Sequence, residues 1–350
     1  MSNLPRIVEK FSGLRVLVIG EAILDRYLYG YANRFCQETP VPVVTLSHCE
    51  NQPGGAANTA VNLRSLGTQV SLLSVIGNDE EGRLLQRALL DYQIDIDPML
   101  VARDRTTLTK QRVMNEERLL LRFDQGTTNN ITASLEHEII RYLTHHFYDY
   151  DAVIVSDYGY GILTSGVIDA IATLRNVEPT SPHFQRSKTL SKTTLSKTLV
   201  VDAKALEHYK TLNVTAVKPN YEQVTQLLPQ TSSERDLSRV DWIIAQTAQI
   251  LAATGAQMVA VTLDQEGAVI LQPQTSPHRI YANPVCPTRT IGAGDTFTAT
   301  LAIALAAGAS PTDAAELAAA AAALVVSKIG TSICTAEELQ AHLSSAVHSA

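Results

Sequence analysis

The chain has 350 residues, of which 45% are hydrophobic and 18% charged, so it can bury a sizeable core as one large α/β domain or two small ones. A net charge of −7 argues against a general nucleic-acid-binding protein, and the four cysteines form no CxxC pair, which favours free thiols over a zinc site or a disulfide framework. Neither a membrane-spanning apolar run nor the apolar segment of a signal peptide is present, so we expect a cytoplasmic protein without a membrane partner.

Short apolar runs alternate with helical patterns along the chain. Residues 14–20 and 69–77 are predicted strands, and each is followed by a predicted helix, at residues 56–66 and 79–90. Further strands are predicted at residues 151–157, 198–202, 214–217 and 257–263. This alternation predicts a doubly wound α/β fold, with a mostly parallel sheet covered by helices on both faces.

Two regions interrupt the alternation. Residues 41–47 and 108–124 have the pattern of exposed strands, the second with a hairpin turn near residues 115–117, and we expect a small β lid built from residues of about 26–50 and 100–125. The segment 179–197 repeats Ser-Lys-Thr and is predicted to be a flexible surface insertion. A basic interaction tail is the alternative for this insertion.

Gly292, Ala293 and Gly294 precede an Ala- and Leu-rich helix that is predicted from about residue 295 to residue 307. Unpaired N–H groups at a helix N-terminus attract anions, and glycines let a phosphate approach them closely. Asp295 would fit beside a phosphate if it accepted a proton from a hydroxyl that attacks it. The alternative is a tight turn in which Asp295 only caps the helix.

Other polar residues follow predicted strands or precede helices. Asp25 comes after the first strand, and Gly54, Gly55 and Asn58 open the first long helix. Later motifs of this kind are Lys218 with Asn220, and Thr262 with Asp264 and Gly267. Because the carboxyl ends of parallel strands meet at one edge of a sheet, one site could collect all of these groups.

In their order, these motifs resemble those of the ribokinase/PfkB superfamily of sugar kinases. The two signatures match residues 54–58 and 292–295, and the resemblance covers roughly residues 14 to 335, so we expect residues 1–350 to form a single kinase domain. Within the superfamily, the chain is most similar to kinases of D-glycero-β-D-manno-heptose 7-phosphate. The stretches behind this likeness are 24–27, 39–43, 53–58, 109–110, 121–124, 156–159 and 328–332.

The resemblance implies an ATP-dependent transfer to the anomeric hydroxyl of the sugar, with Asp295 as general base and the backbone of 292–294 around the transferring phosphoryl group. Sugar hydroxyls would contact Asp25, Gly54, Gly55, Asn58 and Asp157, and the 7-phosphate would contact Lys110, Arg112 and Arg122. ATP would contact Lys218, Asn220, Thr262, Asp264, Gly267 and Lys328, with Mg²⁺ near Glu222. Relatives pair through their lids, so we expect a homodimer. Some relatives also carry a nucleotidyltransferase domain, for which this chain is too short, so only the kinase step is expected.

The residues themselves leave alternatives open. Asp25 could cap a turn, Asp157 could cap a helix, and the three lid cations could be outward charges on an edge strand. Lys110 and Arg112 have the same parity on one predicted strand, and Arg118 and Arg122 share a face of the next. If the two faces coincide, four cations would share one face, which favours an anionic ligand.

The chain departs from the superfamily at several positions. Arg289 stands where relatives have an aspartate that helps bind a monovalent cation, so the resemblance does not extend to K⁺ activation. Gln223 stands where a glutamate is expected to organise the Mg²⁺ water shell, Glu21 replaces an aspartate, and Tyr160 replaces a lysine. These changes leave two further hypotheses: a kinase of ribose, fructose or a nucleoside, and a non-catalytic relative that binds a sugar phosphate or a nucleotide.

Overall fold

We describe the fold from a computed structural model that covers residues 4–116, 118–176, 197–229, 236–282, 292–328 and 332–348. Arg289 and nearly all of the 179–197 insertion lie outside these ranges, so the expectations for them are not addressed. None of the helices in the described ranges has both the length and the apolar character required to cross a membrane.

A central eight-stranded sheet has the order β14-β13-β12-β11-β10-β9-β1-β4. Neighbours from β4 to β12 run parallel, whereas β13 and β14 extend one edge in antiparallel fashion. The prediction of a mostly parallel sheet is therefore confirmed, with an antiparallel edge that it did not include. The strands are β1 (Arg15–Gly20), β4 (Gln69–Leu73), β9 (Ala152–Asp157), β10 (Thr198–Ala203), β11 (Ala216–Val217), β12 (Val259–Thr262), β13 (Ala268–Leu271) and β14 (His278–Ile280).

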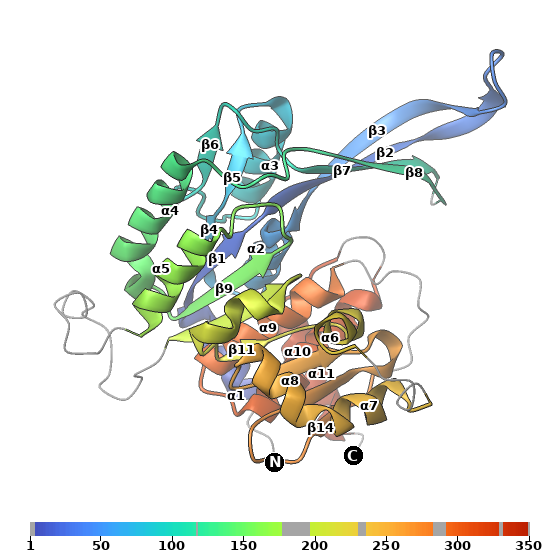
Figure 1. Ribbon diagram of the computed structural model, residues 1–350. Coiled ribbons are helices and arrows are strands. Elements are labelled where there is room, and N and C mark those ends of the chain that lie inside the picture. The colour runs from blue at the N-terminus through green and yellow to red at the C-terminus, as the bar shows by residue number, and fades with distance from the viewer. Residues whose placement is uncertain are drawn as a thin grey trace.

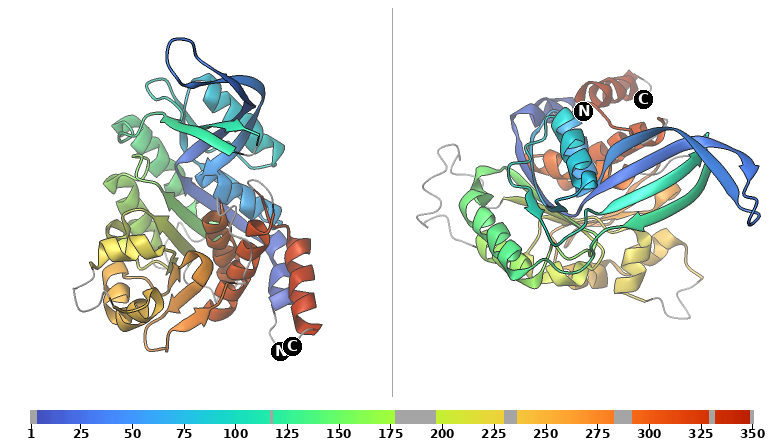
Figure 2. Two further views of the ribbon diagram at one scale, coloured as in Figure 1. Left: turned by 90° about the vertical axis from the view of Figure 1, so that its right-hand side faces the viewer. Right: turned by 90° about the horizontal axis from the view of Figure 1, so that it is seen from above.

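Helices cover both faces of this sheet, as Figures 1 and 2 show. Successive residues of β1 point to opposite faces: Val16 and Val18 join one buried cluster, whereas Leu17 and Ile19 join the other. Strands buried on both faces need an almost continuous apolar run, which the sequence of β1 provides. The first cluster is covered by α1 (Leu4–Glu9), α2 (Ala56–Ser65), α3 (Glu80–Asp91), α9 (Ala293–Ala306), α10 (Pro311–Val326) and α11 (Ala336–His348). The second is covered by α4 (Ala133–His146), α5 (Ser165–Arg175), α6 (Tyr221–Leu227), α7 (Arg239–Ala245) and α8 (Thr247–Thr254).

The predicted lid is a separate four-stranded sheet of order β3-β2-β7-β8, and its β2–β3 arm projects from the core in Figure 1. Its strands are β2 (Ala22–Phe35), β3 (Pro42–Gly55), β7 (Thr109–Asn115) and β8 (Arg118–Gln125). Strand β2 follows β1 after a single residue, so the lid begins earlier than residue 26 and carries Asp25 within a strand. The start of the second predicted lid segment is wrong, because β6 (Leu100–Ala102) pairs with β5 (Val75–Gly77) instead. The predicted strand 69–77 is correspondingly split between β4 and β5.

Helix α9 begins two residues before the predicted start, directly after Gly292, whose φ of 90° few side chains tolerate. The next helix, α10, begins as the sequence indicates: Pro311 is its first residue, and the Ser310 hydroxyl accepts a hydrogen bond from the backbone N–H of Asp313. These two helices pack against each other under the sheet and fix the N-terminus of α9 at the carboxyl ends of the strands.

Candidate active site

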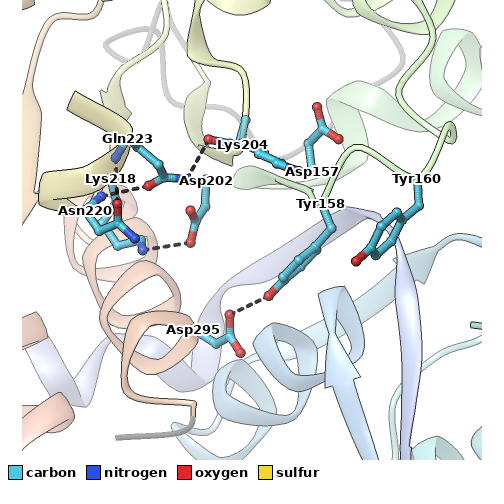
Figure 3. Close-up of a pocket in the computed structure, with 10 residues that line it drawn as sticks. Asp157, Tyr158, Tyr160, Asp202, Lys204, Lys218, Asn220, Gln223 and Asp295 are labelled. Carbon is cyan, nitrogen blue, oxygen red and sulfur yellow. Dashed lines mark hydrogen bonds and ion pairs between the residues drawn. The ribbon is translucent and has the colours of Figure 1, made fainter. Parts of the chain in front are cut away.

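A cavity of ≈310 Å³ lies at the carboxyl ends of β9, β10 and β11, beside the first turn of α9. Parallel α/β sheets place ligand sites at this edge. Figure 3 shows side chains from several separate segments pointing into the same space. The lining residues are Asp157, Tyr158, Tyr160, Asp202, Ala203, Lys204, Lys218, Asn220, Gln223 and Asp295.

The carboxylate of Asp295 is held by two hydrogen bonds. Asn58 Nδ2 donates to Oδ2 at 2.6 Å, and the Tyr158 hydroxyl donates to Oδ1 at 3.1 Å (Figure 3 shows the second bond). Asn58 is itself oriented by Asn62 of the same helix, whose Nδ2 donates to Asn58 Oδ1. The prediction brought Asn58 and Asp295 into one site, and the structure places them in direct contact although they are far apart in the sequence.

The surroundings of Asp295 raise its pKa to about 6. Burial and the nearby charge of Asp202 raise the pKa, whereas the hydrogen bonds from Asn58 and Tyr158 and the charge of Lys218 lower it. A carboxylate with this pKa is ionised near neutral pH but is a stronger base than an exposed aspartate. Asp295 therefore has the properties of a general base, beyond those of a helix cap.

The glycines before Asp295 keep the N-terminus of α9 open. A Cβ on Gly292 would lie 3.1 Å from Asn58 Nδ2, and a Cβ on Gly294 would lie 3.4 Å from Lys218 Nζ. The unpaired N–H groups of the first helical turn face an approaching anion, and the helix dipole adds partial positive charge. Residues 292–294 with Lys218 could therefore hold a transferring phosphoryl group.

Asp202 is a cavity residue that the sequence analysis missed. Its Oδ2 forms an ion pair with Lys218 Nζ at 3.0 Å and accepts a hydrogen bond from the Thr298 hydroxyl at 3.0 Å. Asp202 closes the strand that was predicted at 198–202, and the same strand-end position that marked Asp25 could have marked it too. Tyr158, Tyr160 and Lys204 were also not selected, because they follow strand ends without a distinctive spacing.

On the sugar side, Asp25 lies in lid strand β2 and pairs with Arg112 of β7 instead of capping a turn. Arg112 Nη1 lies 2.6 Å from Asp25 Oδ1, and both side chains are buried. A Cβ on Gly54 would come within 2.3 Å of Asp25 Oδ2. Gly55 has a φ of 58°, and a Cβ at this position would lie 2.5 Å from the carbonyl oxygen of Glu21. Both glycines are therefore required by the close approach of β2 and β3 at this point.

Asp157 lines the cavity but does not cap a helix. Its Oδ1 accepts from the backbone N–H of Gly159 at 2.8 Å, and its Oδ2 accepts from the Tyr209 hydroxyl at 2.6 Å. The N-cap of the following helix α5 is Thr164. A sugar hydroxyl would have to share Asp157 with these partners.

The lid cations share one face, with one exception. Lys110 pairs across the hairpin with Asp124, and Arg112 pairs with Arg122, so these side chains lie on the same side. A bulge near Val113 and Met114 shifts the register, so that Arg118 pairs with Asn115 on the opposite face. The expected group of four cations is therefore a group of three. Lys110 Nζ lies 5.4 Å from the centre of the Tyr158 ring, which directs this face toward the cavity.

Carboxylates already accompany two of these cations. Arg122 forms two hydrogen bonds with Asp124, at 2.8 and 2.6 Å, on the exposed surface of the lid, and Arg112 is paired with Asp25. Within the described ranges, Lys110 has no ion pair; burial lowers its pKa most, while Asp25 raises it.

The residues expected around ATP divide into two groups. Lys218 and Asn220 line the cavity, and Thr262 lies beside Asn220 through a β-bridge. Asp264 and Gly267 instead form the turn between β12 and β13, where Gly267 has a φ of 87°. Lys328 is tied to Glu338 at 2.6 Å and to the Ile333 carbonyl at 2.7 Å. Asp264, Gly267 and Lys328 do not line the cavity.

Glu222, the expected metal residue, is exposed on α6 and accepts a weak hydrogen bond from Gln226 at 3.4 Å, away from the cavity lining. Gln223 has a structural role in the same helix. Its side chain accepts from the Asn220 N–H at 2.7 Å, which completes a capping box, and its Nε2 donates to the Ala203 carbonyl at 3.0 Å. Gln223 thus couples the start of α6 to the end of β10.

The family model for pfkB family carbohydrate kinases matches residues 14–338. The chain belongs to this family. The kinases of the family act on sugars with ATP, so the chain is an ATP-dependent carbohydrate kinase by class.

Individual relatives agree with this assignment. The chain is 33% identical to the bifunctional protein HldE of Desulfatibacillum aliphaticivorans and 31% identical to that of Helicobacter pylori, over 96% and 93% of this chain. It spans only 64% and 65% of those two proteins. Among solved structures, phosphofructokinase-2 from Escherichia coli in complex with potassium has a TM-score of 0.71 at 20% identity, covering 95% of this chain and 99% of that one. Ribokinase from Arabidopsis thaliana complexed with ribose and ATP has a TM-score of 0.66 at 17% identity, with 94% and 98% covered. These two structural likenesses show the ribokinase-like fold.

The environment of Asp295 predicts a specific pH dependence for this pfkB kinase. If Asp295 acts as the general base, it must be deprotonated to accept a proton, so kcat/KM is expected to fall as the pH drops through about 6. Asp295→Asn keeps the side-chain volume but removes the base, and we expect it to lower kcat by about 10²- to 10⁴-fold. ATP affinity, measured by calorimetry, should change little. Retained turnover in Asp295→Asn would remove Asp295 from the role of base.

Proposed function

We propose that this kinase phosphorylates the anomeric hydroxyl of D-glycero-D-manno-heptose 7-phosphate and forms the 1,7-bisphosphate. The observation that carries the proposal is the group of Lys110, Arg112 and Arg122 on the lid face that meets the cavity at Tyr158. A substrate that already carries a phosphate would neutralise this group, whereas a neutral sugar would not. The stretches of sequence that resemble heptose 7-phosphate kinases support the same substrate.

In the proposed reaction, the anomeric O–H gives its proton to the Asp295 carboxylate while its oxygen attacks the γ-phosphorus of ATP. The bond between that phosphorus and the bridging oxygen of ADP breaks, and ADP leaves with the bond's electron pair. Lys218 and the N–H groups at the start of α9 would stabilise the charge on the equatorial oxygens. Asn58 and Tyr158 keep the carboxylate oriented for the proton.

Mg²⁺ would accompany ATP and offset the negative charge of the phosphates. No cluster of three or more His, Cys, Asp or Glu side chains in the described ranges could hold a metal by itself. This fits Mg²⁺, which usually binds one or two carboxylates together with substrate phosphates and water. Asp202 is the carboxylate that fits this role, because it lines the cavity beside Lys218, whereas Glu222 does not.

A kinase of a neutral sugar is the second candidate. It is favoured by the pairing of Arg112 with Asp25 and of Arg122 with Asp124, which leaves less positive charge for a substrate phosphate. The exposed Arg122–Asp124 pair contributes only about 0–1 kcal/mol, so a phosphate can replace Asp124 at low cost. We therefore rank the phosphorylated sugar first.

The substrate panel tests these candidates. Purified protein with Mg-ATP would be offered D-glycero-D-manno-heptose 7-phosphate, ribose, fructose and fructose 6-phosphate, with coupled measurement of ADP release. We expect turnover with the heptose phosphate only, because ribose and fructose carry no phosphate for the lid cations, and fructose 6-phosphate has its anomeric hydroxyl on C2, fewer carbons from its phosphate than in the heptose. Turnover with ribose or fructose would support a sugar kinase but would show that the lid cations are not needed to bind a substrate phosphate.

Arg122 provides a test of the pocket with a matched control. Arg122→Ala should raise the KM for the sugar phosphate about tenfold or more, since a charge-assisted pair contributes about 1.5–3 kcal/mol, and should leave the KM for ATP unchanged. Arg118→Ala removes the same side chain from the opposite face of the same strand, so neither KM should change. Equal effects of the two substitutions on the KM for the sugar phosphate would show that Arg122 does not bind the substrate phosphate.

The lid also supports the proposal of a homodimer. Large apolar side chains are exposed on its strands, among them Leu121 and Phe123 of β8, which share the face opposite the lid cations, and exposed apolar side chains that share a face favour association. Leu121→Asp is expected to convert the dimer into a monomer in sedimentation velocity measurements. Leu90→Asp, on the exposed side of α3, is the control that should leave the mass unchanged. A wild-type protein that sediments as a monomer at all concentrations would exclude pairing through the lid.

A further inference from the structure

The loop after β9, residues 158–162, carries both aromatic residues of the cavity lining, Tyr158 and Tyr160. Its backbone is gripped at three points by side chains from other segments. Glu21 accepts from the N–H of Tyr158 at 2.7 Å and from the N–H of Ile162 at 3.1 Å. Arg105 donates to the Tyr160 carbonyl at 3.1 Å. The two glycines of the loop are held as well, since the Gly159 N–H donates to Asp157 Oδ1 at 2.8 Å and the Gly161 carbonyl accepts from the Ile131 N–H at 2.9 Å.

Glu21 and Arg105, which hold the loop, are charged side chains in buried and half-buried positions, respectively. Glu21 is 0% exposed, which makes it one of the few carboxylates inside the core, and it has no part in the phosphoryl transfer described above. Burying a carboxylate is costly unless it is well hydrogen-bonded. Here two backbone N–H groups and the nearby charge of Arg105 provide compensation. Arg105 also donates to the carbonyls of Thr127 and Asn129, which anchors it to a second loop.

The 158–162 loop contacts Asp295 through the Tyr158 hydroxyl, which is one of two side-chain donors to the carboxylate. Of the two donors to Asp295, Asn58 projects from helix α2, whose own hydrogen bonds fix it. Tyr158 projects from the loop, which contains Gly159 and Gly161 with φ of 73° and 85° and is not part of a helix or strand. The place of the Tyr158 hydroxyl therefore depends on what holds the loop.

We infer that Glu21, assisted by Arg105, is a positioning residue for phosphoryl transfer: it holds the 158–162 loop so that the Tyr158 hydroxyl donates to Oδ1 of Asp295. The inference rests on the proposed role of Asp295 as base. Glu21 acts through Tyr158 and does not touch the substrate. The hydroxyl stabilises the ionised carboxylate, which keeps Asp295 ready to accept a proton at neutral pH.

Charged groups from every neighbouring element contribute to the acid–base behaviour of this arrangement. Asp295 faces Asp202 of β10 and Lys218 after β11, while Tyr158 faces Lys110 and Asp25 of the lid. Glu21 faces Asp157 of β9, Arg105 and Tyr209. Burial and the charge of Asp157 raise the pKa of Glu21 to about 7, so Glu21 titrates close to Asp295 and must be tested separately from it.

Tyr158→Phe removes the hydroxyl and keeps the ring beneath Lys110. Losing a hydrogen bond to a charged group should lower kcat about tenfold. The pKa of Asp295 should rise, so the acidic limb of the kcat/KM profile moves to higher pH and the loss is greater at pH 6 than at pH 8. The KM for ATP should not change. A loss of equal size at every pH would show that the hydroxyl does not act on the base.

Glu21→Gln tests the second link through a double-mutant cycle, with the sugar that the wild type phosphorylates fastest. If Glu21 acts through Tyr158, then Glu21→Gln lowers kcat at pH 8, where wild-type Glu21 is charged, and lowers it less at pH 6, where wild-type Glu21 is largely neutral. At pH 8 the double variant should be no slower than the slower single variant. Additive losses would overturn the inference. If Glu21→Gln does not fold, Arg105→Lys takes its place in the cycle. Glu136→Gln, which removes a carboxylate bonded to Thr164 at the start of α5, is the control that should leave kcat unchanged.

A second measurement needs no sugar. At pH 8, where wild-type Glu21 is charged, hydrogen–deuterium exchange of the peptide that covers residues 158–162 should be at least tenfold faster in Glu21→Gln, because two N–H groups lose their acceptor charge, and unchanged in Tyr158→Phe. Unchanged exchange in Glu21→Gln would show that Glu21 does not hold the loop. Asp295→Asn is assayed in parallel: if it retains turnover, the role of the base and this inference fail together. If it is inactive and the cycle is additive, only the inference about Glu21 fails.

Discussion

The negative charge of Asp295 is the constraint on which the rest of the site depends. A carboxylate at the carboxyl edge of a buried sheet is unfavourable unless its surroundings stabilise the charge. The N-terminus of α9, Asn58, Tyr158 and Lys218 provide that stabilisation from four separate segments. Tyr158 and Lys218 are positioned by the sheet order, because they follow β9 and β11, which flank β10 and end at the same edge. The parallel sheet thus brings two of these groups to the carboxylate of Asp295.

The two arginine–aspartate pairs of the lid differ in the free energy needed to break them. Arg112 and Asp25 are both buried, and breaking a buried pair leaves an uncompensated charge that costs about 3–5 kcal/mol. Arg122 and Asp124 are exposed, and their pair contributes about 0–1 kcal/mol. An incoming anion can therefore recruit Arg122 readily, whereas Arg112 stays with Asp25 and links β7 to β2. Arg122 is therefore suited to binding a substrate anion, and Arg112 is suited to stabilising the lid.

The sequence was sufficient for the features that depend on local pattern. Apolar runs placed β1, β9 and β10 to within about two residues, and motifs at strand ends and helix starts placed Asp295, Asn58 and Lys218 in one site. The sequence was insufficient where a contact between distant segments determines which way a side chain faces. The bulge that turns Arg118 to the other face depends on the β7–β8 register, and the bond from Lys328 to Glu338 depends on how α11 packs. Neither has a periodic signature.

Of the departures from the superfamily pattern, Gln223 and Tyr160 line the cavity, and the change at position 223 leaves the cavity with one carboxylate fewer. At position 223, a neutral side chain donates to the Ala203 carbonyl, which a glutamate could not do when ionised, and it still closes the capping box on Asn220. The helix that carries Asn220 is therefore held without adding a carboxylate beside ATP. Asp202, Asp157 and Asp295 already line the cavity against only Lys204 and Lys218. A further acid would increase repulsion toward the phosphates, so Gln223 is compatible with catalysis provided that Asp202 serves the metal.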